Sequence, residues 1–97
     1  MAANHKLTAL IKGRTINRMQ SSGDTAAITF TDGSTLTVKV AGSPHTASAG
    51  GTIKGVRQAG TELELDFEDG TTLTIQLAEA TSSVMVRDKD GVMEYAD

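Results

Sequence analysis

Apolar and polar residues alternate with a period of two along four stretches of this chain. Alternation of this kind places every second side chain on the same face of a β-strand, so that one face is buried and the other is solvated. We therefore predict four half-buried strands. Their apolar residues are Ala26, Ile28 and Phe30; Leu36, Val38 and Val40; Leu63, Leu65 and Phe67; and Leu73, Ile75 and Leu77.

The four stretches form two pairs because the sequence repeats itself. Residues 13–41 align with residues 50–78 without a gap, and 11 of the 29 aligned positions are identical. The most similar segment runs from Phe30 to Thr37 and returns as Phe67 to Thr74. A duplication of this length predicts two copies of one structural unit, here a three-stranded meander.

The last turn of each meander can be tested against these faces. A two-residue loop at Asp32-Gly33 would set core residues opposite surface residues across the ladder. A three-residue loop, Thr31-Asp32-Gly33, instead pairs Ile28 with Leu36. We therefore predict type I turns with a bulge, in which Gly33 and its counterpart Gly70 are left-handed.

The first strand of each meander carries a predicted bulge. Apolar Ile16 and Met19 are three positions apart rather than two, and their counterparts in the second copy have the same spacing. One extra residue around Arg18, and around Gly55 in the copy, would bring both apolar side chains to the same face.

Two further elements flank the repeats. Asn4 can cap a short helix over residues 4–12, for which a strand is the alternative. Residues 83–96 predict a C-terminal hairpin, and the small polar residues from 42 to 51 predict a connector between the copies. The apolar residues that share one face of the helix are Leu7, Leu10 and Ile11.

Together these elements predict an all-β fold in a single domain, residues 1–97. We expect a small barrel or sandwich of about eight antiparallel strands, built from two tandem three-stranded meanders, a C-terminal hairpin and a short N-terminal helix. The meanders correspond to the repeats, residues 13–41 and 50–78. Because each is apolar on one face only, they must cover one another.

The core of such a fold is thin. The chain has 97 residues and three aromatic side chains, Phe30, Phe67 and Tyr95, with no Trp. Small domains with little core gain stability through association, so we expect a homo-oligomer.

Charge and cysteine content argue against other classes of protein. The formal net charge is −3, whereas nucleic-acid binding depends on clustered Lys and Arg, so we expect no nucleic-acid partner. Such binding would need Arg14, Arg18, Lys54 and Arg57 on one face. The chain has no Cys. No apolar stretch is long enough for a signal peptide or a membrane span, so we expect a cytoplasmic protein without a membrane partner.

Two motifs suggest chemistry, and in both the simpler interpretation is favoured. Asp88-Lys89-Asp90-Gly91 resembles the middle of a calcium loop, but Val86 stands where the first ligand belongs, so we predict a hairpin turn. Ser43 and His45 could join a carboxylate in a hydrolytic triad, but they lie in the connector, and a triad needs rigid placement. We therefore predict no metal, no cofactor and no catalytic residue, and we favour a protein that is not an enzyme.

The two copies differ at their outward positions. In the second copy we predict cross-strand ion pairs rather than an acidic binding stripe, formed by Glu62, Glu64, Asp66 and Glu68 with Lys54 and Arg57. The first copy has a nearly uncharged array, and we predict its binding residues to be Thr29, Thr31, Thr35 and Thr37. A flat threonine array can bind an ordered surface or form an interface, or it can reflect strand propensity alone.

From these patterns we expect a small non-enzymatic β-rich interaction module that self-associates and docks a protein partner. The alternative is a small ligand-binding or hydrolytic β-barrel with its site at the inter-repeat loop or at a subunit junction. An ordered pocket around residues 43–48 would favour this alternative.

Overall fold

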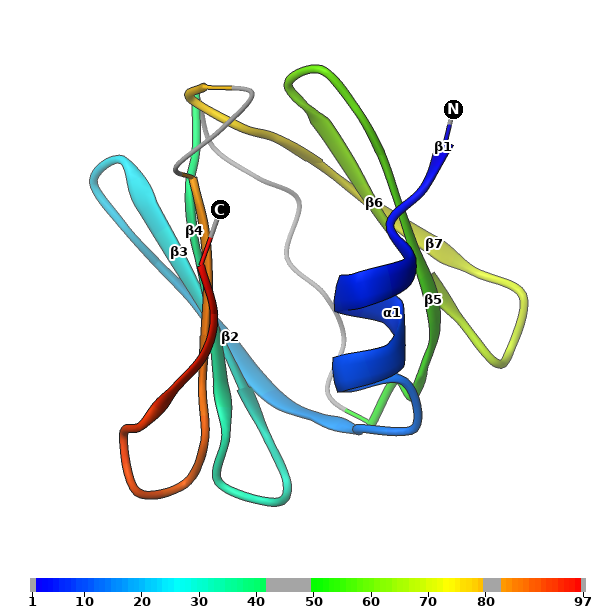
Figure 1. The fold of residues 1–97 in the computed structure, drawn as a ribbon, viewed down its shortest axis with the longest axis vertical. Coiled ribbons are helices and arrows are strands. Elements are labelled where there is room, and N and C mark those ends of the chain that lie inside the picture. The colour runs from blue at the N-terminus through cyan, green and yellow to red at the C-terminus, as the bar shows by residue number, and fades with distance from the viewer. Residues whose placement is uncertain (1, 42–49, 80–82, 97) are drawn as a thin grey trace.

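The computed structural model describes residues 2–41, 50–79 and 83–96. These residues form nine strands and one helix, arranged as two antiparallel sheets that face each other (Figure 1). The elements are β1 (Ala2–Ala3), α1 (His5–Ile11), β2 (Ile16–Ser22), β3 (Thr25–Phe30), β4 (Thr35–Lys39), β5 (Ile53–Ala59), β6 (Glu62–Phe67), β7 (Thr72–Gln76), β8 (Val84–Arg87) and β9 (Met93–Ala96).

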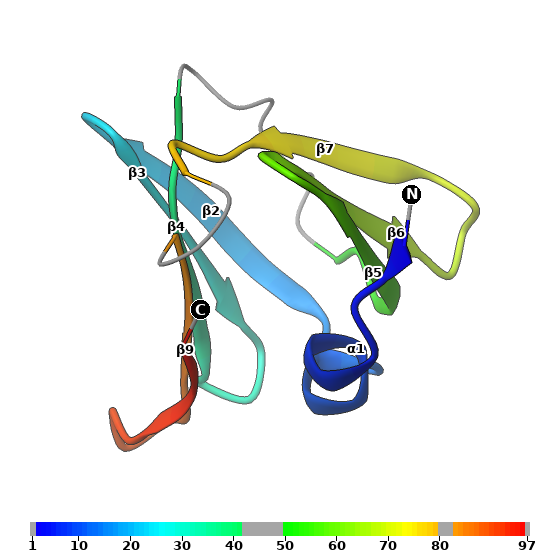
Figure 2. The same cartoon turned by 45° about the horizontal axis from the view of Figure 1, so that its top comes forward.

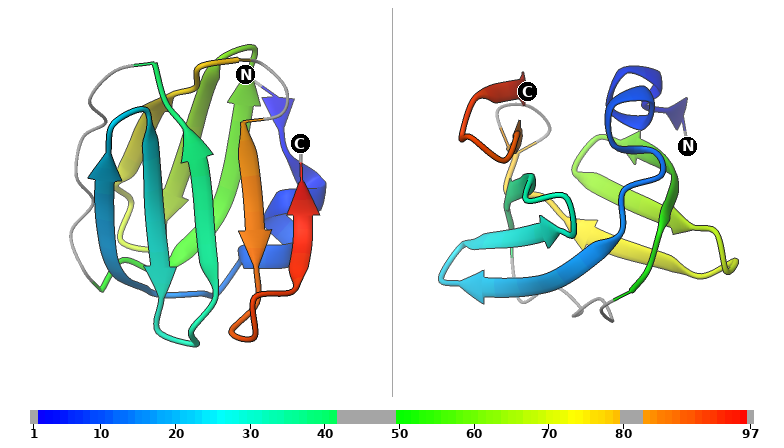
Figure 3. Two further views of the ribbon diagram at one scale, coloured as in Figure 1. Left: turned by 90° about the vertical axis from the view of Figure 1, so that its left-hand side faces the viewer. Right: turned by 90° about the horizontal axis from the view of Figure 1, so that it is seen from below.

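Each repeat supplies three neighbouring strands of one sheet. The first repeat forms β2, β3 and β4, and the second forms β5, β6 and β7. The C-terminal hairpin extends the first sheet to the order β2-β3-β4-β8-β9, which the left view of Figure 3 shows face on. The two-residue β1 extends the second sheet beyond β5. The predicted all-β fold of two meanders, a hairpin and a short helix is thus confirmed.

The fold is sandwich-like. The closed barrel, which the sequence pattern did not distinguish from a sandwich, is not formed. Figure 2 shows the two sheets as separate layers. In the described residues they are joined by the isolated bridges Thr15↔Thr52 and Val40↔Leu77, and the hydroxyls of Thr15 and Thr52 hydrogen-bond at 3.0 Å. The sheets do not otherwise pair in the described residues: β8 occupies the edge of β4, β1 pairs with part of β5, and β7 and β2 end their sheets.

The predicted turns are confirmed. Ile28 pairs with Leu36 in the first repeat, and the second repeat has the matching register. Gly33 has a φ of +90° and Gly70 a φ of +89°, in the left-handed region that glycine tolerates best. Each of these glycine N–H groups donates to the carbonyl three residues earlier, that of Phe30 in the first turn, at 3.0 Å.

The predicted bulges are also confirmed. The register of β2 against β3 shifts between Ile16 and Arg18, and that of β5 against β6 shifts between Ile53 and Gly55. The extra residue lets Ile16 and Met19 both turn toward the core, where Ile16 is buried and Met19 packs against the cluster.

Hydrogen bonds between the repeats come in equivalent pairs. The Ile16 N–H donates to the Gly51 carbonyl at 2.8 Å, and the Ile53 N–H donates to the Arg14 carbonyl at 2.9 Å. The repeat offset converts each bond into the other. The two repeats are therefore related by approximate twofold symmetry.

The same symmetry holds where the last strands of the two repeats end. The Ala41 N–H donates to the Gln76 carbonyl at 3.0 Å, and the Ala78 N–H donates to the Lys39 carbonyl at 2.9 Å. The ends of β4 and β7 are therefore hydrogen-bonded to each other, whereas the rest of these two strands are not.

The N-terminal helix is confirmed, with the predicted cap. The Asn4 side chain accepts a hydrogen bond from the Leu7 N–H at 3.0 Å, and Leu7 and Ile11 are fully buried. The helix is fixed to β5 through Thr8, whose hydroxyl oxygen accepts from the Val56 N–H at 2.9 Å. In the part of the chain that the structure describes, no helix is long and apolar enough to cross a membrane.

The helix also contacts the C-terminal hairpin. The Asn4 side-chain amide donates to the Tyr95 hydroxyl at 3.2 Å, and the Lys6 amine lies 6.0 Å from the centre of the Tyr95 ring. Arg14, just after the helix, forms an ion pair with Glu94 at 3.2 Å. The helix thus packs on β5 (Figure 3, right), and side chains of the helix and its flanking residues reach across to β9.

One apolar cluster fills the space between the sheets. The helix contributes Leu7 and Ile11, the hairpin contributes Val84 and Val86, and the alternating strand residues supply the rest. The alternation in the sequence therefore marks the core as predicted. The strand residues of the cluster include Ala26, Ile28, Phe30, Leu36, Val38, Ile53, Val56, Leu63, Leu65, Phe67, Leu73 and Ile75.

Candidate functional site

Three of the four predicted binding threonines lie together on the outer face of the five-stranded sheet. Thr29 on β3 is directly opposite Thr35 on β4, and Thr37 is opposite Ala27. All three threonine side chains are half-buried by their neighbours. Thr31 is separate from them, because it lies beyond the end of β3 in the exposed turn.

These threonines belong to two rows that cross all five strands, which we call the threonine face. The rows follow from the registers of neighbouring strands, since residues paired in a ladder share a face. The first row contains Arg18, Thr29, Thr35, Arg87 and Met93, and the second contains Gln20, Ala27, Thr37, Met85 and Ala96.

The threonine face has cations at its margin and no carboxylate in its rows. Arg18 and Arg87 belong to the first row, and Lys39 lies at the end of β4. Glu94 on β9 does not join the face, because it is the extra residue at a register shift and its carboxylate accepts from Arg14. The centre of the face is therefore uncharged and combines threonines with Ala27 and Met85.

The outer face of the other sheet carries an ion-pair network, which we call the charged face. Arg57 on β5 donates to both Asp66 oxygens at 2.8 Å and to Glu64 at 2.6 Å. The Thr72 hydroxyl donates to Asp66 at 2.9 Å. The predicted cross-strand ion pairing is thus confirmed for Arg57, Glu64 and Asp66.

Hydrogen bonding keeps the Arg57–Asp66 pair ionised. The bonds from Arg57 hold the pKa of the Asp66 carboxyl below its ordinary value, with a smaller contribution from the Thr72 hydroxyl. Partial burial opposes the shift but does not reverse it. The same contact raises the pKa of Arg57. Both groups are therefore charged at neutral pH.

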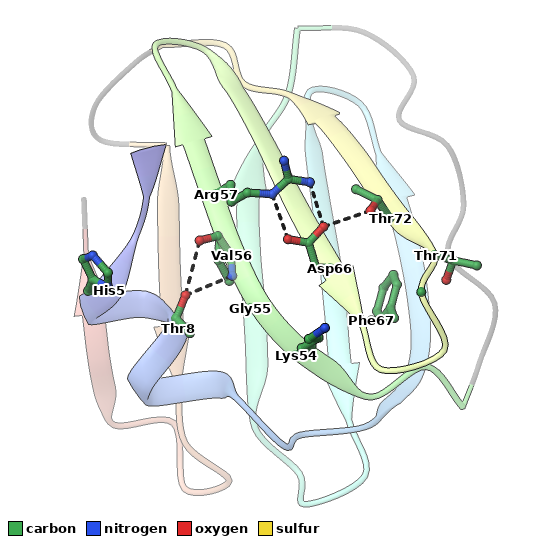
Figure 4. Close-up of a pocket in the computed structure, with 11 residues that line it drawn as sticks. His5, Thr8, Lys54, Gly55, Val56, Arg57, Asp66, Phe67, Thr71 and Thr72 are labelled. Carbon is green, nitrogen blue, oxygen red and sulfur yellow. Dashed lines mark hydrogen bonds and ion pairs between the residues drawn. The ribbon is translucent and has the colours of Figure 1, made fainter. Parts of the chain in front are cut away.

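A pocket with a volume of about 350 Å³ lies beside the charged face, between α1 and the strands β5 to β7 (Figure 4). Its polar side chains include Lys54, Arg57, Asp66 and Thr72, and His5 and Thr8 come from the helix. Gly55 in its wall leaves space, since a Cβ there would lie 3.9 Å from the nearest atom, the Thr8 methyl. The remaining lining residues are Val56, Phe67, Gly70 and Thr71.

The ion-paired carboxylate of this pocket is not suited to act as a general acid. A general acid at neutral pH needs a raised carboxyl pKa, whereas that of Asp66 is lowered. The guanidinium of Arg57 is already committed to Asp66 and Glu64. Lys54, whose charge also helps to lower the pKa of Asp66, and His5 are the exposed groups at the pocket outside the hydrogen-bonded network.

The motif at the C-terminal hairpin forms a turn, as predicted. The Asp88 carboxylate accepts from the N–H groups of Asp90 and Val92 at 2.9 Å, and Gly91 has a φ of +83°. Nowhere in the described segments do three His, Cys, Asp or Glu side chains gather in a way that could hold a metal ion.

Several residues singled out in the sequence lie elsewhere. Ser43 and His45 fall outside the described residues. The four cations weighed for nucleic-acid binding do not share a face: Arg18 is on the threonine face, and Arg57 is on the opposite sheet. Arg14 is paired with Glu94 and, at 3.6 Å, with Asp32.

No protein-family model, curated protein or solved structure matches this chain.

Sequence reasoning missed the pocket and the helix residues that line it. His5 and Thr8 reach the charged face because the helix before the first repeat packs on β5 of the second repeat. No local sequence pattern predicts this packing, since it brings a helix that precedes the first repeat onto a strand of the second repeat. The only signal was Gly55, whose missing side chain leaves room beside the helix.

Proposed function

We propose that this protein is a non-enzymatic interaction module that self-associates and docks a protein partner through the threonine face. The cytoplasmic location expected from the sequence belongs to the same proposal. The observation that carries the proposal is the contrast between the two outer faces, since one is uncharged at its centre and the other is covered by ion pairs.

The side chains of the threonine face suit a protein contact. Thr29, Thr35 and Thr37 are held by cross-strand neighbours, so that covering them would cost little side-chain entropy. Met85 and Met93 add adaptable apolar surface, and Met93 is 47% exposed. Interface centres are generally depleted in charge with a polar rim, and this is the pattern formed here by Arg18 and Arg87.

A photo-cross-linking experiment tests the docking surface. A benzophenone side chain at position 37 should give discrete covalent adducts in cells that make the protein, because Thr37 lies at the centre of the face. The same group at Thr61, an exposed turn residue of the second repeat, is the matched control. Equal labelling from both positions, or none from position 37, would contradict the proposed surface.

A second candidate is small-ligand binding in the pocket beside the charged face, which is favoured by its volume of about 350 Å³ and by the exposed Lys54 and His5. This differs from the site expected at the inter-repeat loop, residues 42–51, most of which lies outside the described residues. Ligand-induced amide shifts confined to residues around Lys54, and lost in Lys54→Ala but not in Lys39→Ala, would support it.

A further inference from the structure

In the described part of the chain, β7 is the last strand of its sheet, whereas the equivalent β4 is not. β4 pairs with β8 over Thr35–Val38. The matching segment of β7 is Thr72–Ile75, and the two read Thr-Leu-Thr-Val and Thr-Leu-Thr-Ile. By the repeat symmetry, the edge of β4 that pairs with β8 corresponds to the edge of β7, which pairs with no further strand in the described residues.

The backbone groups that face outward on β7 can be identified from its hydrogen bonds. The Phe67 N–H donates to the Thr71 carbonyl at 2.9 Å, so residue 71 faces β6, and alternate residues point the other way. Thr72, Thr74 and Gln76 therefore face outward. The Gln76 carbonyl already accepts from the Ala41 N–H. The N–H and carbonyl groups of Thr72 and Thr74 are the ones available to a new strand.

We propose that β7 pairs with β7 of a second copy of this chain, antiparallel, about a twofold axis at Leu73. In this register Thr72 of one copy faces Thr74 of the other, and the two residues exchange both backbone hydrogen bonds. Leu73 faces its own counterpart on the core side. A register centred on Thr74 is disfavoured, because it would use the Gln76 carbonyl that Ala41 occupies.

The chemistry of the edge favours a second copy as the occupant. The outward side chains of Thr72, Thr74 and Gln76 are exposed and uncharged, so a twofold axis brings no like charges together. The carboxylates on β6 would be separated from those of the other copy by three strand spacings, roughly 14 Å. That exceeds the Debye length of about 8 Å at physiological salt.

The other edge strands are less suited to self-pairing. β1 is two residues long, and β9 pairs with β8 through a register shift and carries Glu94. β2 contains a bulge and carries Arg18, and a bulge and a charge are two devices that protect an edge from pairing. β7 has neither a bulge nor a charged residue, and its Leu73 side chain, 7% exposed, lies at the rim of the core. Pairing at Leu73 would cover this rim.

This inference rests on the proposed self-association and assigns it to the edge of one sheet, away from the threonine face of the other. The two surfaces can therefore be tested separately.

The first test is the double variant Thr72→Lys/Thr74→Lys, measured by sedimentation equilibrium. Lysines would face each other across the twofold axis, so the dimer should weaken by at least about tenfold, which corresponds to ~1.4 kcal/mol. The control is Ala9→Lys/Thr61→Lys, which adds the same charge at exposed positions away from both surfaces. The control should dimerise like the unmodified chain.

A mixing experiment checks that charge, and not misfolding, causes the loss. Thr72→Asp/Thr74→Asp alone should also be monomeric, but an equimolar mixture of the Lys and Asp variants should form a heterodimer. A mixture that stays monomeric although both variants keep the circular dichroism of the unmodified protein would overturn the proposal.

A cysteine variant keeps the proposal testable if the charged variants do not fold. The chain has no Cys, so Leu73→Cys introduces a single thiol at the axis, where facing residues are close enough for a disulfide. Leu73→Cys should oxidise to a covalent dimer, and Thr61→Cys should not. Equal cross-linking of the two variants would overturn the register.

The outcomes separate the two claims. If Thr72→Lys/Thr74→Lys still dimerises while Thr29→Lys/Thr37→Lys does not, the edge pairing is wrong and self-association belongs to the threonine face. If the unmodified chain is monomeric at every concentration, both the edge pairing and the proposed self-association fail. The cross-linking result from position 37 is unaffected by either.

Discussion

At matched positions on their outer faces, the two repeats carry different chemistry on one backbone. The first repeat has Gln20, Ala27 and Thr29 where the second has Arg57, Glu64 and Asp66. The inward residues between them stay apolar in both copies. This comparison shows that the core pattern and the turns are enough to specify the meander, which leaves the outer face free to become a charged network or an uncharged surface.

The turns show how an added element changes one copy. In both repeats an Asp carboxylate accepts from the N–H and the hydroxyl of the residue two positions later, which lowers the pKa of Asp32 through Ser34 and that of Asp69 through Thr71. Ser34 is nevertheless buried, and Thr71 is exposed. The difference arises because the turn of the C-terminal hairpin lies over the first repeat alone, with Lys89 beside Gly33.

The largest expected effect tests whether both copies contribute to one core. Phe30→Ala and Phe67→Ala should each lower the free energy of unfolding by about 3–5 kcal/mol, as for other buried Phe side chains. Phe30 should be the more costly, since it is 1% exposed and Phe67 is 7% exposed. Urea unfolding measures both, and a neutral Phe67→Ala would break the equivalence of the repeats.

The turn glycines should give the next largest effect and should differ between the copies. Gly33→Val and Gly70→Val each force a β-branched residue to a positive φ, which costs about 1–3 kcal/mol. A Cβ at position 33 would also lie 3.0 Å from the Lys89 Cβ, whereas one at position 70 meets nothing within 4 Å. Gly33→Val should therefore be the more destabilising in the same urea assay. The reverse order would contradict the covering of the first turn by the hairpin.

The charged face should make the second repeat contribute to acid sensitivity. The folded pKa of Asp66 is lowered, so its ionised form stabilises the fold above the unfolded pKa of about 3.9. That contribution is lost as the pH falls through the folded pKa. As the pH is lowered, the urea midpoint of Asp66→Asn should fall less steeply than that of the unmodified chain. The midpoint of Thr29→Asn, changed at the matched position, should fall as steeply as that of the unmodified chain. Identical acid profiles for Asp66→Asn and the unmodified chain would contradict this account of the network.

The smallest effect on stability is expected from converting one face into the other. Arg57→Gln/Glu64→Ala/Asp66→Thr places the residues of the first repeat on the second, and it removes the whole half-buried network rather than one member of it. Its unfolding midpoint should change less than that of either glycine variant. A large loss of stability would mean that the network, and not only the core, holds the second sheet.

The sequence predicted the elements that depend on local pattern. Alternation located the core residues, the spacing of Ile16 and Met19 located the bulge, and the choice of loop length fixed the register at Ile28 and Leu36. Asn4 and the apolar face of residues 7–11 predicted the helix. Each of these features is written in neighbouring residues, and the repeat supplied a second, independent example of most of them.

Features that depend on which surfaces meet could not be predicted. The alternation at Val84 and Val86 does not distinguish pairing with β7, the preceding strand, from pairing with β4, the strand that β8 joins. The two edges carry the same Thr-Leu-Thr pattern, so their sequence does not distinguish them. The pocket was missed for the same reason, since it exists only because α1 packs on β5. The oligomeric state likewise depends on which surfaces meet.

Sedimentation equilibrium of the unmodified chain over a wide concentration range tests the central claim most directly. We predict that the apparent mass rises with concentration from the monomer value of 10.1 kDa toward twice that value. A mass that stays at the monomer value up to the highest concentration would contradict an account in which these surfaces serve association.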